Sequence, residues 1–555
     1  MDMAKIASPL KRIIELINLD RKEIVSIYFF AISSGLVQLS LPLGVQAIIS
    51  FVLGATMVTS IYILIFVVVL GVILVGVFQI NQMKIIEKIQ QNIFVRNSFQ
   101  IAENLPQIDL FSNNEYYLPE KVTRYFDVMS VQKGISKILL DIPLASIQII
   151  FGLLLLSFYH PVFIIFGLLL LIILILILRI TGKKGVDTSY MVSNQKYNVS
   201  AWFIEIARTI KSFKFRNGTG LNMHQTDNKV NDYLGARTNH FKVLLLQFKT
   251  LVIFKVLITL TMLTVGTYLL LDQQLNIGEF IAAEIVILSI IGAVEKLIGS
   301  LPNVYDVIIG LEKIASVTES KKEKSGKIEF LGKTEGVQLA VKDCSFQYPN
   351  GKRVFKNISF DIPKGAKVAV TGIEGSGKST LLNLISGNYS KYEGEVLVNT
   401  IELSNYDFCS FRKRVGFYLS LNDVFKGTLF DNIAMGRKSV TPDKIMEIAN
   451  LMGLDHILKM LNNGLETVID PAGLNVSSTI VKTIVLIRAF VDSPDLLLLE
   501  DPWGGFNQSI KDKLINYILN LNTTVIVATN SSDFLEKSNI RLEISEGIVN
   551  LNKLN

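Results

Sequence analysis

Two long stretches of this chain carry no charged residue, and they limit the folds that it can adopt. No Asp, Glu, Lys or Arg occurs from Ile24 through Met83, or from Ile142 through Leu178. A helix that spans a bilayer needs about 20 predominantly apolar residues, so each stretch has room for two spans. Half of the 555 residues are hydrophobic and the mean hydropathy is +0.42, which is more apolar than an ordinary soluble protein. The sequence therefore predicts a multi-pass membrane protein that has the lipid bilayer as a partner.

The pattern of apolar segments predicts six membrane helices. Their expected positions are Ile24–Leu53, Met57–Ile80, Ile138–Tyr159, Pro161–Ile180, Leu251–Leu271 and Gly278–Leu301. The connections within each successive pair are short and lack Lys and Arg, whereas the loops between the pairs are long and basic. Because basic loops stay in the cytoplasm, both long loops and the N-terminus are expected there. Helix-period apolar residues in these loops predict that the membrane helices extend beyond the bilayer, with turns near Ile108–Asn114 and Phe213–Leu221.

Composition divides the chain into four expected segments. Residues 1–23 have an apolar helical face, which predicts an amphipathic helix on the inner membrane surface. Residues 24–316 form the predicted transmembrane domain, and residues 317–336, rich in Lys, Glu and Ser, predict a solvated linker. Residues 337–555 are enough for one globular domain with its own core.

Several single residues and the net charge lead to further expectations. Pro42 is expected to kink the first span, and Lys255 to lie near the inner interface. Glu284, inside the sixth span, either faces a cavity or partner or lies near the outer interface in contact with water. Cys344 and Cys409 lack metal-ligand spacing and are expected to be buried small apolar residues. The net charge of +7 is scattered and accompanies no base-reading motif, so no nucleic-acid partner is expected.

The most specific motif follows the membrane region. It is a complete phosphate-binding loop, G-x-x-x-x-G-K-[ST], between a buried-strand pattern at 367–370 and a helix pattern at 381–385. Its glycines allow backbone N–H groups to face a polyphosphate, and the following helix N-terminus favours an anion. The residues expected to bind the nucleotide are Gly372, Ile373, Glu374, Gly375, Ser376, Gly377, Lys378, Ser379 and Thr380.

Six membrane helices, long cytoplasmic loops and one P-loop domain, in that order, resemble ABC transporters of the exporter type. The resemblance implies an all-α polytopic membrane domain followed by an α/β P-loop NTPase domain of ABC type, with ATP and Mg²⁺ as cofactors. It implies that Tyr348 stacks on adenine, although an aromatic of the strand core is the alternative. It also implies that Glu500, at the end of a Walker B-like strand, helps Ser379 to hold Mg²⁺.

Several positions depart from the pattern of that family. The usual Asp-Glu pair is reversed as Glu500-Asp501, so the carboxylate that polarises water is the shorter Asp501. Asn530 stands at the position of the switch histidine, and Ser420 at that of the glutamine that ligates Mg²⁺. In the segment that aligns with the signature Leu-Ser-Gly-Gly-Gln, only Ser477 is retained. ATP binding is therefore expected to be intact and hydrolysis to be weak.

The resemblance implies a half transporter, which must pair with a second half transporter as a homodimer or heterodimer. The expected location is a bacterial plasma (inner) membrane, with the ATP-binding domain in the cytoplasm. The exported substrate could be a peptide, protein, lipid or drug, because nothing in the sequence selects among them. A degenerate regulatory subunit, or a membrane ATP sensor that acts with an active partner, is the alternative.

Overall fold

The computed structural model describes residues 3–54, 58–109, 118–215, 220–332, 335–349, 351–419, 423–470 and 476–553. These residues form two compact units, and the chain passes from the first to the second between Ser320 and Lys321. Gln107, Ile108 and Asp109, from the first long loop, belong to the second unit.

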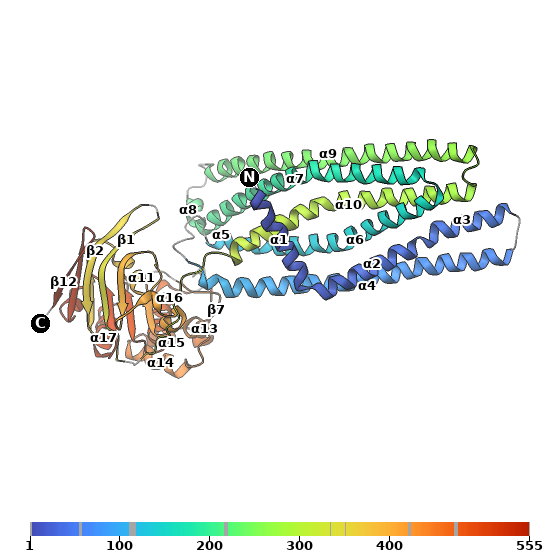
Figure 1. The fold of residues 1–555 in the computed structure, drawn as a ribbon. Coiled ribbons are helices and arrows are strands. Elements are labelled where there is room, and N and C mark those ends of the chain that lie inside the picture. Colours follow the sequence, from blue (N-terminus) through green and yellow to red (C-terminus); the bar gives the residue numbers. More distant parts are fainter. Residues whose placement is uncertain are drawn as a thin grey trace. The chain divides into compact units, whose positions relative to one another are not determined.

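Every regular element described in the first unit is a helix (Figure 1). The helices are α1 Met3–Leu19, α2 Arg21–Gln38, α3 Ser40–Leu53, α4 Val58–Asn104, η1 Leu105–Gln107, α5 Leu118–Thr123, η2 Arg124–Phe126, α6 Asp127–Tyr159, α7 Val162–Arg208, α8 Ile210–Phe215, α9 Leu221–Leu271 and α10 Ile277–Thr318. Six of the described helical segments are long and apolar enough to cross a membrane. The prediction of six membrane helices is thereby confirmed in number and order.

Four of these helices are much longer than a bilayer is thick. The lengths of α4, α7, α9 and α10 lie between 42 and 51 residues. At 1.5 Å per residue they measure about 60–80 Å, roughly twice the 30 Å hydrocarbon core. The expectation that membrane helices continue into the long loops is therefore confirmed. Of the two expected turns, residues 110–114 and 216–219 lie outside the described part of the chain.

Pro42 accounts for a break in the first span. The ring of Pro42 leaves no N–H for the carbonyl of Gln38, and α2 ends at Gln38 while α3 begins at Ser40. In the last two spans, Lys255 forms an ion pair with Glu295, with 2.5 Å between Nζ and Oε2. Glu284 is half-buried and has neither a hydrogen bond nor an ion pair with another described residue.

The amphipathic N-terminal helix differs from its expected role. Ile13, Leu16 and Ile17 of α1 pack against the buried cluster that α2, α4, α6 and α10 share. Arg12 forms an ion pair with Glu319 at 2.6 Å. The three residues therefore contact protein side chains and are partly buried by them, which the expectation of an apolar face on the membrane surface did not include. Ile14 remains exposed.

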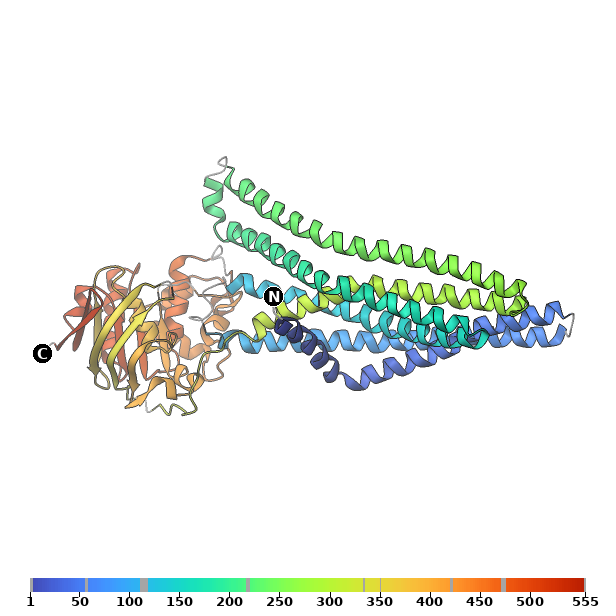
Figure 2. The same ribbon diagram turned by 45° about the horizontal axis from the view of Figure 1, so that its top comes forward.

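Helices α7, α8 and α9 form an arm of the first unit. Figure 2 shows that the end of this arm that carries α8 diverges from the other long helices. Large apolar side chains are exposed on the arm at positions between the fourth and fifth expected spans. They include Phe203, Phe215, Leu221, Met223 and Leu234.

The second unit is an α/β domain with two principal sheets. A six-stranded sheet has the order β12-β11-β3-β10-β9-β6, in which only β12 is antiparallel to its neighbour. A four-stranded antiparallel sheet has the order β2-β1-β4-β5. The strands are β1 Leu339–Gln347, β2 Arg353–Ile362, β3 Lys367–Thr371, β4 Glu393–Val398, β5 Ile401–Glu402, β6 Val415–Tyr418, β7 Gly427–Thr428, β8 Val468–Ile469, β9 Leu496–Glu500, β10 Thr524–Ala528, β11 Ile540–Ser545 and β12 Ile548–Lys553.

The helices of this unit cover both faces of the six-stranded sheet. They are α11 Lys378–Ile385, η3 Leu403–Asn405, α12 Phe408–Arg412, α13 Leu429–Ala434, α14 Pro442–Leu451, α15 Asp455–Lys459, η4 Gly464–Glu466, α16 Ser478–Phe490, α17 Gln508–Asn520 and α18 Ser532–Leu535. In β9, Leu496 and Leu498 face the core that contains α11, whereas Leu497 and Leu499 face the core with α13 to α17. Because side chains alternate along a strand, these uninterrupted leucines indicate a strand buried on both faces.

Two smaller expectations change with the structure. Cys344 is buried, and burial raises the pKa of its thiol to about 11, but Cys409 is exposed on α12. The expectation that both cysteines are buried is therefore wrong for Cys409. The charged segment after α10 is exposed, yet it is hydrogen-bonded to other parts of the second unit: the N–H of Glu323 donates to the carbonyl of Gln107 at 2.9 Å, and that of Ile328 to Asn405 at 3.0 Å.

Candidate nucleotide-binding site

The loop between β3 and α11 depends on glycine at two positions. Gly372 and Gly377 have φ angles of +155° and +111°. A Cβ at Gly372 would lie 2.6 Å from the carbonyl oxygen of Ile544, and one at Gly377 would lie 2.7 Å from Val354. Any other residue would be strained and would clash, so the loop keeps a shape that leaves its backbone open. The predicted strand, loop and helix are all present.

Two polar side chains of the loop, Lys378 and Ser376, differ in their contacts. The Nζ of Lys378 donates to the carbonyls of Gly372 and Ile373, at 2.7 and 2.9 Å. The buried hydroxyl of Ser376 has no hydrogen-bond partner among the described residues. A buried hydroxyl without a partner is uncommon, and here it accompanies a lysine and the N-terminus of α11. This combination suits an anion with several oxygens, such as a polyphosphate.

The acid pair lies at the C-terminal end of β9. The hydroxyl of Ser379 donates to Oε1 of Glu500, so these two expected metal ligands are brought together. Oxygen donors of this kind are the ligands that Mg²⁺ prefers. Asp501 is exposed and has a left-handed backbone, with φ +42°, which Asp tolerates better than most residues. A Cβ at Gly504 would lie 2.5 Å from Oδ2 of Asp501, so glycine leaves room for this carboxylate.

Tyr418 is a residue of this region that the sequence patterns did not single out. It ends β6, pairs with Leu499 next to Glu500, and is buried. Burial, together with the negative charges of Asp501 and Glu500, raises the pKa of Tyr418 to about 12. Its hydroxyl therefore keeps its proton near the acid pair at physiological pH. The signal that could have found it was its place in Gly416–Ser420, the segment that aligns with the magnesium-ligating glutamine.

Asn530 follows β10 and contacts the first glycine of the loop. Its Oδ1 accepts a hydrogen bond from the N–H of Gly372 at 3.3 Å, and its Nδ2 donates to the carbonyl of Gly372 at 3.1 Å. The carbonyl of Gly372 thus accepts from both Asn530 and Lys378. Asn530 is engaged with the loop backbone in the conformation that the structure describes.

Tyr348 contacts the loop through its hydroxyl. Its oxygen lies 2.9 Å from Oγ1 of Thr380, which is buried at the start of α11. The ring of Tyr348 is half-buried and packs edge-on against Phe346 and Tyr389, with centroids 5.1 and 5.9 Å away. Both the expected stacking role and the alternative core role are compatible with this half-buried position.

The remaining expected site residues are more dispersed. Ser477 is exposed and caps α16, because its hydroxyl accepts a hydrogen bond from the N–H of Ile480. Ser478 and Thr479 begin that helix, so side chains occupy the positions where the family pattern has glycines. Glu374 and Ile373 are exposed at the tip of the phosphate loop. Ser420 lies outside the described residues.

The geometry defines the class of protein. The loop of Gly372–Thr380, Glu500 and Asn530 meet at the carboxyl ends of parallel strands, which is where nucleotides bind in open α/β sheets. The second unit is thus a P-loop nucleotide-binding domain, and a unit of six candidate membrane helices precedes it in the chain.

Comparisons with known proteins show which proteins the chain is similar to. Residues 355–504 match the family model described as ABC transporter. The chain is 24% identical over 290 residues to the alpha-hemolysin translocation ATP-binding protein HlyB of Escherichia coli O157:H7, covering 52% of this chain and 41% of that protein. It is 22% identical over 435 residues to the transport/processing ATP-binding protein ComA of Streptococcus pneumoniae, covering 77% of this chain and 60% of ComA. The chain thus spans less than two thirds of the length of these curated relatives.

The fold is also found in a solved structure. A bacterial Atm1-family ABC exporter with ATP bound superposes with a TM-score of 0.86 at 15% sequence identity, covering 96% of this chain and 95% of that chain. The chain therefore has the fold of that exporter, and the part of it that matches the ABC transporter family follows six candidate membrane helices.

Proposed function

We propose that this chain is an ATP-binding subunit of an ABC exporter, which couples ATP binding to the export of an unidentified substrate across the plasma membrane. In this proposal, the N-terminus and the ATP-binding domain lie in the cytoplasm. The basic long loops support this orientation. Hydrolysis by this subunit is proposed to be weak.

The observation that carries the proposal is the preformed phosphate loop. Its backbone is held open by Gly372 and Gly377, and the partnerless hydroxyl of Ser376 and the ammonium of Lys378 lie on it. An ATP polyphosphate would replace the carbonyls that Lys378 now contacts. Ser379 and Glu500 would hold Mg²⁺, which neutralises charge on the β- and γ-phosphate oxygens when it is bound.

Three features support weak hydrolysis. Asp501, which takes the place of the water-polarising acid, has a shorter side chain on a left-handed backbone. Asn530 holds the backbone of Gly372 and carries no positive charge to place on a γ-phosphate. Ser478 and Thr479 add side chains at the start of α16, where a close backbone approach to phosphate requires glycine.

We further propose that two such subunits associate. The arm formed by α7, α8 and α9 exposes large apolar side chains outside the expected membrane spans, and Phe215 is 88% exposed. Exposed apolar surface of this extent marks an interaction site. A second copy of this chain would form two sites with the same altered residues, whereas a different half transporter would form two mixed sites.

Nucleotide binding to the purified full-length chain tests the central proposal. Lys378→Ala should weaken ATP binding by at least about tenfold, because it removes the charged partner of the phosphates. Lys364→Ala, an exposed lysine in the turn before β3, is the matched control and should bind ATP like the parent chain. Equal ATP affinities in Lys378→Ala and Lys364→Ala would contradict the proposed site.

A regulatory subunit is the second candidate. The same altered residues favour it, since a chain that binds ATP without turnover could serve an active partner. ATP-driven transport in vesicles that contain only this chain would exclude the regulatory candidate. ATP-driven transport by a second half transporter alone, at a rate that changes when this chain is co-reconstituted, would favour it.

A further inference from the structure

A small basic cavity lies in the second unit, apart from the phosphate loop. Its volume is about 170 Å³. Its lining combines cationic and aromatic side chains, with a single acidic residue, Asp109. The residues that the argument uses are Lys321, Lys324, Lys391, Tyr389, Tyr392 and Phe408. Nothing in the expected chemistry of ATP binding requires these residues.

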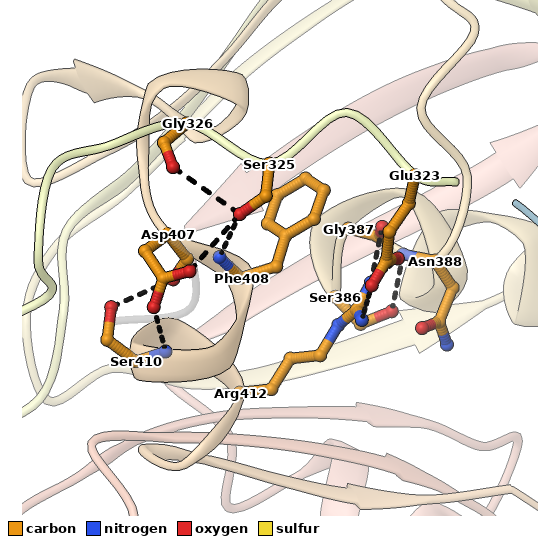
Figure 3. A network of polar contacts seen from close by, with 10 residues as sticks. All are labelled: Glu323, Ser325, Gly326, Ser386, Gly387, Asn388, Asp407, Phe408, Ser410 and Arg412. Atoms are coloured by element: carbon orange, nitrogen blue, oxygen red, sulfur yellow. Dashed lines mark hydrogen bonds and ion pairs between the residues drawn. The ribbon is translucent and has the colours of Figure 1, made fainter. Parts of the chain in front are cut away.

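One wall of the cavity is held firmly in place. We call residues Lys321–Glu329 the strap. Figure 3 shows that Arg412 binds the carboxylate of Glu323 through two hydrogen bonds, each of 2.7 Å. In the same view, the hydroxyl of Ser325 accepts from the N–H of Phe408 at 2.8 Å. Lys324 stands between these two fixed residues, so its backbone is held where its side chain can line the cavity.

The start of the strap is also fixed. The N–H of Asp109 donates to the carbonyl of Lys321 at 2.9 Å, and that of Glu323 donates to Gln107 at 2.9 Å. Lys321 and Asp109 both line the cavity. Lys321 and Lys324, the strap lysines that line the cavity, therefore belong to a segment that is hydrogen-bonded at both ends, and this arrangement lowers the entropic cost of binding a ligand.

The opposite wall connects to the phosphate loop. Gly387, which lines the cavity, follows the C-cap residue Ser386 of α11, and its carbonyl accepts a hydrogen bond from Arg412 at 3.0 Å. The ring of Tyr389 stacks on Phe346, with an interplanar angle of 8° and centroids 5.4 Å apart. Tyr389 also contacts the ring of Tyr348, whose hydroxyl is bonded to Thr380.

The charges and the size of the cavity restrict the ligand. Three lysines against one aspartate leave an excess of positive charge, which suits a dianion. Two serine hydroxyls, of Ser390 and Ser404, add hydrogen-bond donors. A volume of about 170 Å³ corresponds to roughly five or six water molecules and is below the usual range for drug-sized ligands. Aromatic rings on the same lining offer an apolar surface for the remainder of a small molecule.

We propose that this cavity is a regulatory site for a small phosphate monoester. The ligand's phosphate contacts Lys321, Lys324 and Lys391, and its carbon skeleton lies on Tyr389, Tyr392 or Phe408. Two lining residues connect the cavity to the phosphate loop: Gly387 follows α11, and Tyr389 contacts Tyr348. Through these residues, a ligand in the cavity changes the affinity of the phosphate loop for ATP. This regulatory consequence rests on the proposed ATP-binding function, whereas the binding of a phosphate monoester does not.

Isothermal titration calorimetry on the full-length chain tests the binding itself. The experiment uses a Lys378→Ala background, which weakens the phosphate loop as a competing site, and it uses inorganic phosphate and O-phosphoserine as probes. We expect saturable binding of O-phosphoserine, with a dissociation constant of about 1 mM or below. Lys321→Ala combined with Lys324→Ala should weaken it by about tenfold or more. Lys327→Ala, on the same strap but outside the lining, should leave it unchanged.

Two results would overturn the site. One is the absence of saturable heat up to about 10 mM of either probe. The other is an unchanged affinity in the Lys321→Ala, Lys324→Ala double variant.

A second titration measures ATP binding to the chain with Lys378 intact, with and without O-phosphoserine. A shift of about threefold or more that the double variant abolishes supports the regulatory link, and an unchanged ATP affinity rejects it. If the chain failed to bind ATP at all, the proposed function would fail, while the first titration would still decide whether the cavity binds a phosphate monoester.

Discussion

Asn530 and Gly372 are joined by two hydrogen bonds, one from the N–H of Gly372 and one to its carbonyl. The amide of Asn530 therefore connects the end of the β10 segment to the first residue of the phosphate loop. A neutral amide matches a peptide group in both donor and acceptor, whereas a protonated histidine offers donors only. Asn530 is thus suited to positioning the loop rather than to stabilising a γ-phosphate.

Replacement of Asn530 should change ATP binding more than turnover. Asn530→Ala removes both hydrogen bonds to Gly372, and we expect a loss of about 1–2 kcal/mol, or roughly five- to thirtyfold in ATP affinity. Asn530→Asp keeps the acceptor for the N–H of Gly372 and should lose less. Titration of the purified variants with ATP measures both effects.

Asn530→His tests the alternative to a positioning role. If the only effect of Asn530 is the loss of the family's switch histidine, Asn530→His should by itself raise the rate of phosphate release. We expect no gain in turnover and a weaker ATP affinity, because an imidazole cannot reproduce both bonds to Gly372. An increase in turnover of about tenfold or more would contradict the positioning role.

Two variants of Tyr348 can show whether its ring stacks on adenine or belongs to the core. Tyr348→Phe keeps the ring and removes the 2.9 Å contact with Thr380, whereas Tyr348→Ala removes both. If the ring stacks on adenine, the Phe variant should bind ATP like the parent chain and the Ala variant should lose about 0.5–1.5 kcal/mol. Equal losses in the two variants would indicate that the hydroxyl matters and that Tyr348 belongs to the core. Titration with ATP and with inorganic triphosphate makes the comparison, since only ATP has a base.

The sequence predicted those features that depend on local patterns. The charge-free stretches required membrane helices, and the loop Gly372–Thr380 required a strand before it and a helix after it, so both were predictable. The pairing of Asn530 with Gly372 joins positions that are 158 residues apart, and no local pattern contains it. The same holds for Arg412 and Glu323, which are 89 residues apart, and for Lys255 with Glu295 in the membrane region.

Cys409 and α1 illustrate another limit of sequence patterns. An apolar face on α1 predicts burial but does not identify the surface that it contacts, and Ile13, Leu16 and Ile17 are partly buried against other helices. Cys409 belongs to the short helix α12, where neighbouring Phe408 and Phe411 are buried instead. Composition alone does not decide which side of so short a helix faces the core.

The strap should become accessible to protease when its ion pair is removed. Arg412→Ala eliminates two bonds to Glu323 and one to the carbonyl of Gly387. The strap contains four lysines, so trypsin can cut it once its backbone opens. We expect cleavage between the two units to be several-fold faster in Arg412→Ala than in the parent chain. Arg353→Ala, which removes an exposed arginine of β2, is the control and should be cut at the parental rate.

Cysteine labelling in intact cells can determine the orientation of the chain in the membrane. Cys409→Ser provides the background, because Cys344 is buried. Gln274→Cys, in the short connection before α10, should react with a membrane-impermeant reagent from outside, whereas Asn228→Cys on α9 should react only after permeabilisation. Thr56, Asn113 and Asn217 occupy comparable connections but lie outside the described residues. Labelling of Asn228→Cys in intact cells would reverse the proposed topology.

The proposed mechanism depends most on the prediction that this chain hydrolyses ATP slowly. The purified chain should release phosphate at well below about 1 s⁻¹, with Lys378→Ala as the blank, whereas enzymes commonly reach about 1–10³ s⁻¹. Restoring the family order with Glu500→Asp and Asp501→Glu should recover little. The left-handed backbone at position 501, with φ +42°, suits Asp better than Glu, and Gly504 leaves limited room beside it. Turnover of about 1–10 s⁻¹ by the parent chain would mean that Asp501 is an adequate base here and that this subunit works as an ATPase without a different partner.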